Sequence, residues 1–217
     1  QCYSTTGSFS YSWSPDGKWI LMSYCARNHY PYDDIGIVST KGGEPMINLT
    51  ESGYTDSAPQ WVLGGNAILF ASERYGMRNH ASWGTLEDVM IVFLHRKASD
   101  DFRMTKEERE LEKEIAALAE DKKDKDEKKE DKAEDIVVEL DGIDERIIER
   151  IIRLTPTSSN LGSAALSKDG TTLYYQASYE SGMNLWKYDL EKGTPTKIGS
   201  ASGRMKWDGK QSTLYVL

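Results

Sequence analysis

A nine-residue pattern that returns four times along the chain constrains its fold more than any other feature. Each copy begins with a large apolar residue, passes through a turn and ends in an apolar, β-prone pair. The copies occupy residues 13–21, 61–69, 166–174 and 207–215. An internal repeat of this kind indicates equivalent structural units that stack side by side.

The first copy carries the clearest turn signal, Ser-Pro-Asp-Gly at 14–17. Its proline presets the φ angle of the second turn position, while serine suits the first position and glycine the last. Serines alternate with Tyr11 and Trp13 before the turn, and the apolar run 19–22 follows it. This pattern predicts a hairpin with one half-buried and one deeply buried strand.

Further β-rich segments follow the turns. We expect second strands at 68–72, 173–178 and 214–217, third strands at 35–38 and 184–190, and fourth strands at 45–50 and 196–198. Four short antiparallel strands in roughly 40–50 residues are typical of a β-propeller blade. The sequence therefore predicts an all-β fold, a partial β-propeller of four-stranded antiparallel blades with a charged helical insertion. The alternative is a β-sandwich that repeats a turn.

The spacing of the copies also predicts the domain organisation, a single partial propeller over 1–217. We expect blades at about 1–52, 53–160 and 161–200, an incomplete blade at 201–217, and an insertion at about 96–145 inside the second blade. The chain starts at Gln1 and stops within its fourth repeat, so we expect a piece of a longer protein. Unpaired sheet edges in a partial ring predict self-association, or an edge capped by a terminal strand.

The insertion differs in composition from the rest of the chain. Between residues 120 and 135 only Ala133 is uncharged, which favours a solvated helix extension or disorder. The capping-box sequence at 105–108 precedes an apolar stripe of Leu111, Ile115 and Leu118 and predicts a helix over 106–118. Segments 136–140 and 147–154 are expected to return the chain to the blade as strands, although the isoleucines of the latter would also suit a helix. The insertion is either a docking arm or a solvated surface insertion.

Composition excludes several classes of function. The net charge of −8 and the lack of a basic stripe argue against nucleic acid and against an anionic membrane surface. No apolar run approaches the roughly 18 residues that a membrane span needs. Cys2 and Cys25 flank the first hairpin and can form a disulfide or remain free thiols.

No catalytic motif is present in the sequence, and His29, His80 and His95 lack a second ligand at a recognised metal spacing. We therefore expect no catalytic residue, metal or cofactor. The candidate recognition residues lie in loops 27–34 and 74–84, which mix aromatic, histidine and charged side chains. They are Asn28, His29, Tyr30, Tyr32, Arg74, Tyr75, Arg78, Asn79, His80 and Trp83. The alternative is that these loops only pack their own aromatic side chains.

The motif at 13–18 resembles the repeat of the propellers in TolB, prolyl oligopeptidases and tricorn-type peptidases. More specific segments are similar to the propeller region of tricorn-like serine peptidases from bacteria of the Bacteroides group, and the resemblance covers essentially the whole chain. These segments are 72–94, 153–162, 166–170 and 182–186, together with the charged insertion. The second copy departs from the repeat with Gly64-Gly65, and the fourth copy shortens its turn.

The resemblance implies a multidomain parent in which propellers precede a PDZ-like domain and a catalytic core that holds the nucleophilic serine. No stretch of this chain matches that core, so we expect a non-catalytic segment that guides or filters peptide substrates and scaffolds assembly. Its implied partners are the parent's remaining domains and peptide substrates, in the periplasm or alternatively the cytoplasm. The alternatives are a TolB-like interaction module and the propeller of a prolyl-oligopeptidase-type hydrolase.

Overall fold

The computed structural model describes residues 10–26, 30–77, 84–120, 135–139, 146–179 and 182–217. They form four antiparallel sheets, and within each sheet the strands follow sequence order. The first sheet contains β1 (Tyr11–Trp13), β2 (Trp19–Tyr24), β3 (Asp34–Ser39) and β4 (Ile47–Asn48). The second contains β5 (Asp56–Val62), β6 (Ala67–Ser72), β7 (Asp88–Phe93) and β8 (Ile151–Arg153). The third contains β9 (Asn160–Leu166), β10 (Thr172–Ser178), β11 (Asn184–Asp189) and β12 (Thr194–Ser200), and the fourth contains β13 (Met205–Trp207) and β14 (Leu214–Val216).

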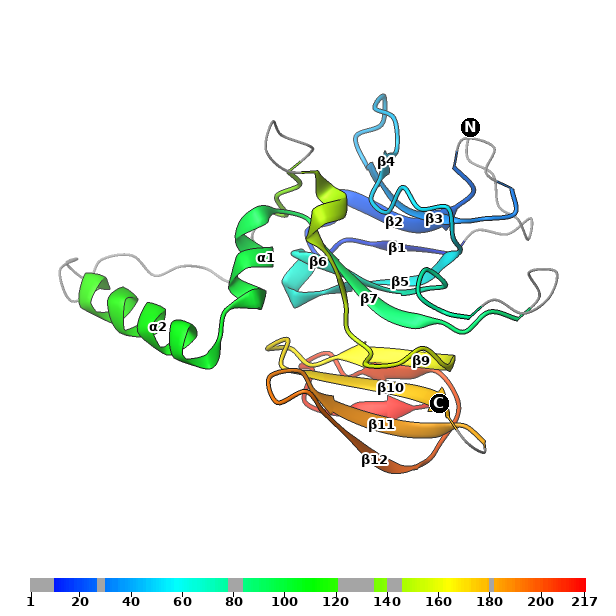
Figure 1. The fold of residues 1–217 in the computed structure, drawn as a ribbon. Coiled ribbons are helices and arrows are strands. Elements are labelled where there is room, and N and C mark those ends of the chain that lie inside the picture. Colours follow the sequence, from blue (N-terminus) through cyan, green and yellow to red (C-terminus); the bar gives the residue numbers. More distant parts are fainter. Residues whose placement is uncertain (1–9, 27–29, 78–83, 121–134, 140–145, 180–181) are drawn as a thin grey trace.

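Figure 1 shows the first three sheets stacked in the order of the sequence, as expected for blades around a common axis. The first strands of neighbouring sheets are linked to one another. Side-chain hydrogen bonds join them: Trp61 Nε1 to the Ser12 carbonyl at 3.5 Å, Gln60 Nε2 to the Ala164 carbonyl at 3.2 Å, and Trp207 Nε1 to the Leu166 carbonyl at 2.9 Å. The predicted fold class is therefore confirmed: this is an all-β propeller fold of antiparallel blades with a helical insertion.

Two apolar cores lie between successive sheets. The core between the first and second sheets contains Leu21, Ile35, Ile37, Ile68, Phe70, Met90 and Val92. The core between the second and third sheets contains Ala67, Leu69, Val89, Ile91, Phe93, Leu173 and Tyr175. Successive side chains of β6 and β7 alternate between these cores, because neighbouring residues of a strand point to opposite faces.

The repeated turns of the first and third sheets have the same hydrogen bonds. Ser14 Oγ donates to Asp16 Oδ1 at 2.6 Å and accepts from the backbone N–H of Trp19 at 2.9 Å. Ser167 Oγ likewise donates to Asp169 Oδ1 at 2.6 Å. This bond is the largest of the interactions that hold the pKa of Asp169 below its ordinary value. The serine hydroxyl and the aspartate carboxylate together satisfy the hydrogen-bonding groups of the turn. The apolar pattern of the sequence alone does not determine the geometry of this turn.

The second sheet replaces this turn with the short helix η1 (Leu63–Gly65). Gly64 has a φ of 68° and Gly65 a φ of 100°, both in the left-handed region that favours glycine. A Cβ atom on Gly65 would overlap the side chain of Ile136, which returns from the insertion. The departure of this copy from the repeat therefore makes room for the returning segment.

The insertion lies between β7 and β8 and contains α1 (Arg96–Arg103), α2 (Lys106–Glu120) and η3 (Ile147–Arg150). The predicted helix over 106–118 is confirmed in α2. Its capping box is present, since the Thr105 N–H donates to Glu108 Oε2 at 2.7 Å and the Glu108 N–H to Thr105 Oγ1 at 3.2 Å. The pattern gave no prediction of α1.

The prediction of a strand over 136–140 is wrong for its described residues. Segment 135–139 has no regular secondary structure and belongs to no sheet. Its backbone N–H groups bond elsewhere: that of Ile136 to Asp16 Oδ2 at 3.0 Å and that of Glu139 to the Leu94 carbonyl at 2.8 Å. The strand expected over 147–154 is confined to β8, because η3 forms its first part.

Cys25 is buried and its thiol is free, whereas Cys2 lies outside the described residues. Tyr11 and Trp13, expected on a half-buried strand, are both more than half exposed. None of the helices in the described ranges is long and apolar enough to cross a membrane.

Candidate recognition surface

The loops that follow the second strands gather at one end of the sheets. The Asp56 N–H at the start of β5 bonds to the Asp33 carbonyl of the β2–β3 loop at 2.8 Å. Glu87 of the β6–β7 loop exchanges two backbone hydrogen bonds with Ser159, which precedes β9. In both cases the loop after the second strand of one sheet is hydrogen-bonded to the start of the next sheet. The described residues of the candidate recognition loops 27–34 and 74–84 therefore belong to one surface, here called the loop end.

Four of the predicted recognition residues are described. Tyr30 is three-quarters exposed, Tyr75 is more than half exposed, and Tyr32 and Arg74 are partly buried. The exposed side chain of Met77 extends the apolar part of the β6–β7 loop. The other predicted residues lie outside the described residues: Asn28, His29, Arg78, Asn79, His80 and Trp83.

Tyr75 makes a cation–π contact with Arg153, which is paired with a buried aspartate. The Arg153 guanidinium carbon lies 5.3 Å from the centre of the Tyr75 ring. Arg153 Nη2 also lies 2.8 Å from Asp88 Oδ1, and the Asp88 side chain is fully buried. An exposed aromatic side chain of the loop end is thus connected to the framework of the second sheet.

Asp88 receives several hydrogen bonds at the first position of β7. Arg153 Nε donates to Oδ1 at 2.9 Å, Thr155 Oγ1 to Oδ1 at 2.7 Å and Ser158 Oγ to Oδ2 at 2.7 Å. These donors lie at the end of β8 or directly after it. The Asp88 carboxylate therefore links β8, the outer strand of this sheet, to β7. Bonds to an ionised group of this kind are stronger than neutral ones.

The first and third sheets have related networks at the same strand position. Asp34 opens β3 and accepts from Asn48 Nδ2 at 2.7 Å and from the Ser52 N–H at 2.9 Å. Asn184 opens β11, and its Oδ1 accepts from Ser200 Oγ at 3.2 Å. These residues were not predicted from the sequence. The signal that could have found them is the similarity of Asn-Leu-Thr at 48–50 to Arg-Leu-Thr at 153–155, each paired with an upstream aspartate.

Asp56 lies between the first and second sheets, below the loop end, and is fully buried. Burial raises the pKa of this carboxyl group to about 6, and the nearby charge of Asp34 acts in the same direction. Hydrogen bonds from Ser72, Thr50 and Ser52 oppose the shift without cancelling it. The junction between these sheets therefore contains a carboxyl group that titrates close to neutral pH.

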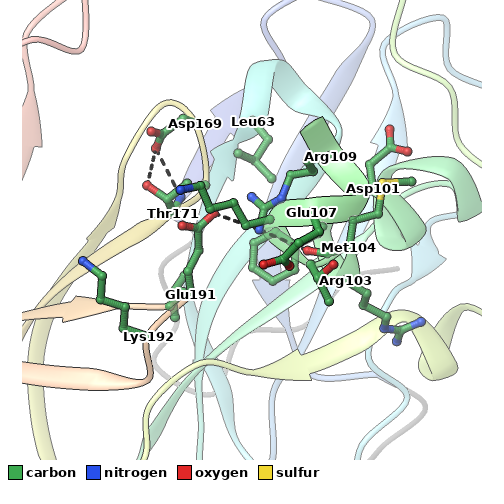
Figure 2. Close-up of a pocket in the computed structure, with 15 residues that line it drawn as sticks. Leu63, Asp101, Arg103, Met104, Glu107, Arg109, Asp169, Thr171, Glu191 and Lys192 are labelled. Carbon is green, nitrogen blue, oxygen red and sulfur yellow. Dashed lines mark hydrogen bonds and ion pairs between the residues drawn. The ribbon is translucent and has the colours of Figure 1, made fainter. Parts of the chain in front are cut away.

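A cleft of about 900 Å³ lies at the other end of the sheets, between the insertion and the turns of the third sheet (Figure 2). Figure 2 shows Arg109 of α2 and Glu191 of the β11–β12 loop pointing toward each other, and Arg109 Nη2 lies 2.9 Å from Glu191 Oε1. The Phe102 ring, at the base of the cleft wall, packs 5.0 Å from the ring of Phe93. The cleft was not predicted from the sequence, because it forms only when the end of α1 and the start of α2 are brought next to the turns of a distant repeat.

Several polar side chains of the cleft and its surroundings have structural partners. Acidic and basic groups are mixed around the cleft, and Arg109 and Glu191 satisfy each other. His95 caps α1, since its Nδ1 accepts from the Ala98 N–H at 3.2 Å. Within the described ranges, no group of three or more His, Cys, Asp or Glu side chains is arranged to hold a metal ion.

No protein-family model matches the sequence, and no curated protein matches it. Solved structures do match. The crystal structure of the tricorn protease aligns with 95% of this chain at a TM-score of 0.58 and 10% sequence identity, and TolB from Acinetobacter baumannii aligns with 95% at 0.53 and 13%. A prolyl endopeptidase aligns with 92% at a TM-score of 0.45 and 9% identity, which is too low to argue from.

The chain spans only 20% of the matched tricorn protease chain and 36% of the TolB chain. At these identities the likeness concerns the fold, and it gives no support to the narrower assignment to the Bacteroides group. The blades with their repeated turns and the alignments with the two solved structures indicate the same fold. This chain has the β-propeller fold found in tricorn protease and in TolB.

Proposed function

We propose that this chain is a non-catalytic propeller segment of a tricorn-like serine peptidase, where it guides or filters peptide substrates and scaffolds assembly. The observation that carries the proposal is the loop end. Exposed Tyr30 and Tyr75 stand there on loops whose bases are fastened by buried Asp34 and Asp88. Rigidly based loops with exposed aromatic side chains are suited to binding extended chains.

The physical chemistry of the loop end favours peptides over other partners. Tyrosine offers a peptide both a flat apolar surface and a hydroxyl group, at little cost in side-chain entropy. The net charge of −8 opposes binding to nucleic acid. The proposed partners are peptide substrates and the remaining domains of a longer parent, and the proposed compartment is the periplasm, with the cytoplasm as the alternative. We retain one propeller over 1–217, with blades as expected from the sequence.

A TolB-like interaction module is the second candidate, and the likeness to TolB from Acinetobacter baumannii favours it. Such a module would bind the surface of a folded protein instead of a short peptide. The two candidates therefore differ in the kind of ligand that the loop end accepts.

The test is peptide binding by the whole chain, measured by fluorescence anisotropy with fluorescein-labelled peptides from digested casein. We expect saturable binding that weakens at least about fivefold, or about 1 kcal/mol, in a Tyr30→Ser, Tyr75→Ser double variant. Tyr215→Ser removes an exposed tyrosine of β14 and is the matched control. We also expect no release of new amino groups from the peptides.

If the Tyr30→Ser, Tyr75→Ser double variant binds peptides as strongly as the unmodified chain, the proposed role of the loop end is wrong. Absence of binding by the folded chain would favour the interaction module. Hydrolysis that follows the protein through purification would overturn the non-catalytic assignment.

A further inference from the structure

Helix α2 projects away from the sheets (Figure 1). Its apolar stripe is exposed. The exposed fractions of Leu111, Ile115 and Leu118 are 57%, 58% and 68%. These are the large aliphatic residues of an otherwise highly charged helix, and they lie at i, i+4 and i+7 on one face. A contiguous exposed apolar stripe with polar borders is characteristic of a protein-binding surface.

The charges of α2 are sorted with respect to this stripe. At about 100° per residue, five of the six glutamates of α2 fall within about 100° of the stripe on either side, whereas Glu120 and the basic residues fall on the opposite face. The flanking acids are Glu107, Glu108, Glu110, Glu112 and Glu114, and the opposite basic residues are Lys106, Arg109 and Lys113. The apolar stripe is therefore bordered by negative charge alone.

Arg109 of the basic face contacts the body of the protein. Arg109 Nη2 pairs with Glu191 of the third sheet at 2.9 Å and donates to the Met104 carbonyl at 3.0 Å. The capping box of Thr105 and Glu108 fixes the start of the helix. These contacts orient α2 before any partner arrives, which lowers the entropy cost of binding through the opposite, apolar face.

The acidic borders decide what can cover the stripe. A second copy of α2 would place glutamates against glutamates, and like charges beside a helical interface are unfavourable. An anionic membrane surface would be repelled for the same reason. A groove bordered by lysine and arginine would complement both the apolar stripe and its rim.

We propose that α2 is a docking arm, which inserts Leu111, Ile115 and Leu118 into an apolar groove of a protein partner whose rim is basic. The mode is that of an amphipathic helix in a groove, with anchors at i, i+4 and i+7. This proposal is independent of peptide recognition at the loop end, which lies at the other end of the sheets.

The experiment uses the whole chain and a synthetic helical peptide with a Leu/Ile stripe flanked by lysines, labelled with fluorescein. We expect saturable binding by anisotropy that weakens with added sodium chloride, because the flanking charges are exposed. Replacing Leu111, Ile115 and Leu118 together by glutamine should weaken binding at least about tenfold, while glutamine's helix propensity preserves α2. Glu112→Gln with Glu114→Gln should weaken it less and reduce the salt dependence.

Two controls keep the outcome specific. Ala117→Gln changes an exposed residue of the same helix away from the stripe and should bind like the unmodified chain. A peptide with glutamates in place of the flanking lysines should not bind. Circular dichroism must show that the triple variant retains its helix.

Three results would overturn the proposal. The first is equal binding by the unmodified chain and by the helical triple variant. The second is equal binding of the lysine and glutamate peptides. The third is self-association that is seen in sedimentation velocity and is abolished by the triple substitution.

Discussion

Asp56 shows how one buried side chain can make the junction between two sheets depend on pH. Its folded-state pKa of about 6 lies above the ordinary value of 3.8, mainly because of burial. The protonated group is therefore favoured in the folded state. Its contribution to stability is fully present below the unfolded-state pKa and is lost as the pH rises through about 6.

Asparagine at position 56 cannot ionise. We therefore predict that Asp56→Asn changes the free energy of unfolding more favourably at pH 8 than at pH 4, compared with the unmodified chain. At about 1.4 kcal/mol per pKa unit, the difference between the two pH values reaches about 2.5 kcal/mol. Urea unfolding at both pH values measures it. Asp208→Asn is the matched control, because Asp208 is partly exposed and the N–H of Thr213 is the first of several donors that lower its pKa. An Asp56→Asn effect that is the same at both pH values would contradict the assignment.

The networks around Asp34 and Asp88 could not be predicted by examining one segment at a time. Asp88 meets Thr155 and Ser158 only because the insertion lies between β7 and β8 and returns the chain to the same sheet. Such contacts between residues far apart in the sequence follow from topology, and topology follows from the repeat. The exposed positions of Tyr30 and Tyr75, in contrast, agree with the composition of their loops, because aromatic residues between strands leave a local signal. The role of these loops in recognition stays a prediction.

At the level of elements, the periodic strands were predictable and the irregular segments were not. β6, β10 and β11 follow their apolar patterns closely. The returning segment 135–139 has a strand-like composition, but the Asp16 carboxylate and the Leu94 carbonyl accept its N–H groups. Helix α1 is short and mostly polar, and it depends on the His95 cap and on packing by Phe102.

The contact between Gly65 and the returning segment leads to a prediction for this element. Gly65→Ala should destabilise the protein by roughly 1–3 kcal/mol more than Gly42→Ala does. Both glycines have positive φ, but a Cβ atom would overlap Ile136 at Gly65 and meet nothing within 4 Å at Gly42. Urea unfolding of the two variants measures the difference. Equal losses would show that Ile136 is not held against η1.

At the level of the whole molecule, the repeat was sufficient to predict the propeller fold, because equivalent sheets need one another to bury their faces. The middle sheet illustrates this, with β6 and β7 contributing to both cores. The cleft at the insertion required the folded structure, since nothing in the local sequence of α2 specifies its contact with Glu191.

The outer sheets lead to the last prediction. Tyr11 and Trp13 of β1 are more than half exposed, as are Tyr215 of β14 and the neighbouring Leu217. Apolar groups on two different sheets can meet head to tail between copies, a contact that does not close by two-fold symmetry. We therefore expect sedimentation velocity to show self-association that increases with concentration.

A Tyr11→Ser, Trp13→Ser double variant should reduce this association, because it removes apolar area from one side of the contact only. Ile198→Ser on β12 removes a comparably exposed apolar side chain and is the matched control. A chain that stays monomeric at every concentration would contradict the prediction. Association lost only on substitution of Leu111, Ile115 and Leu118 would assign the contact to α2 instead of the sheets.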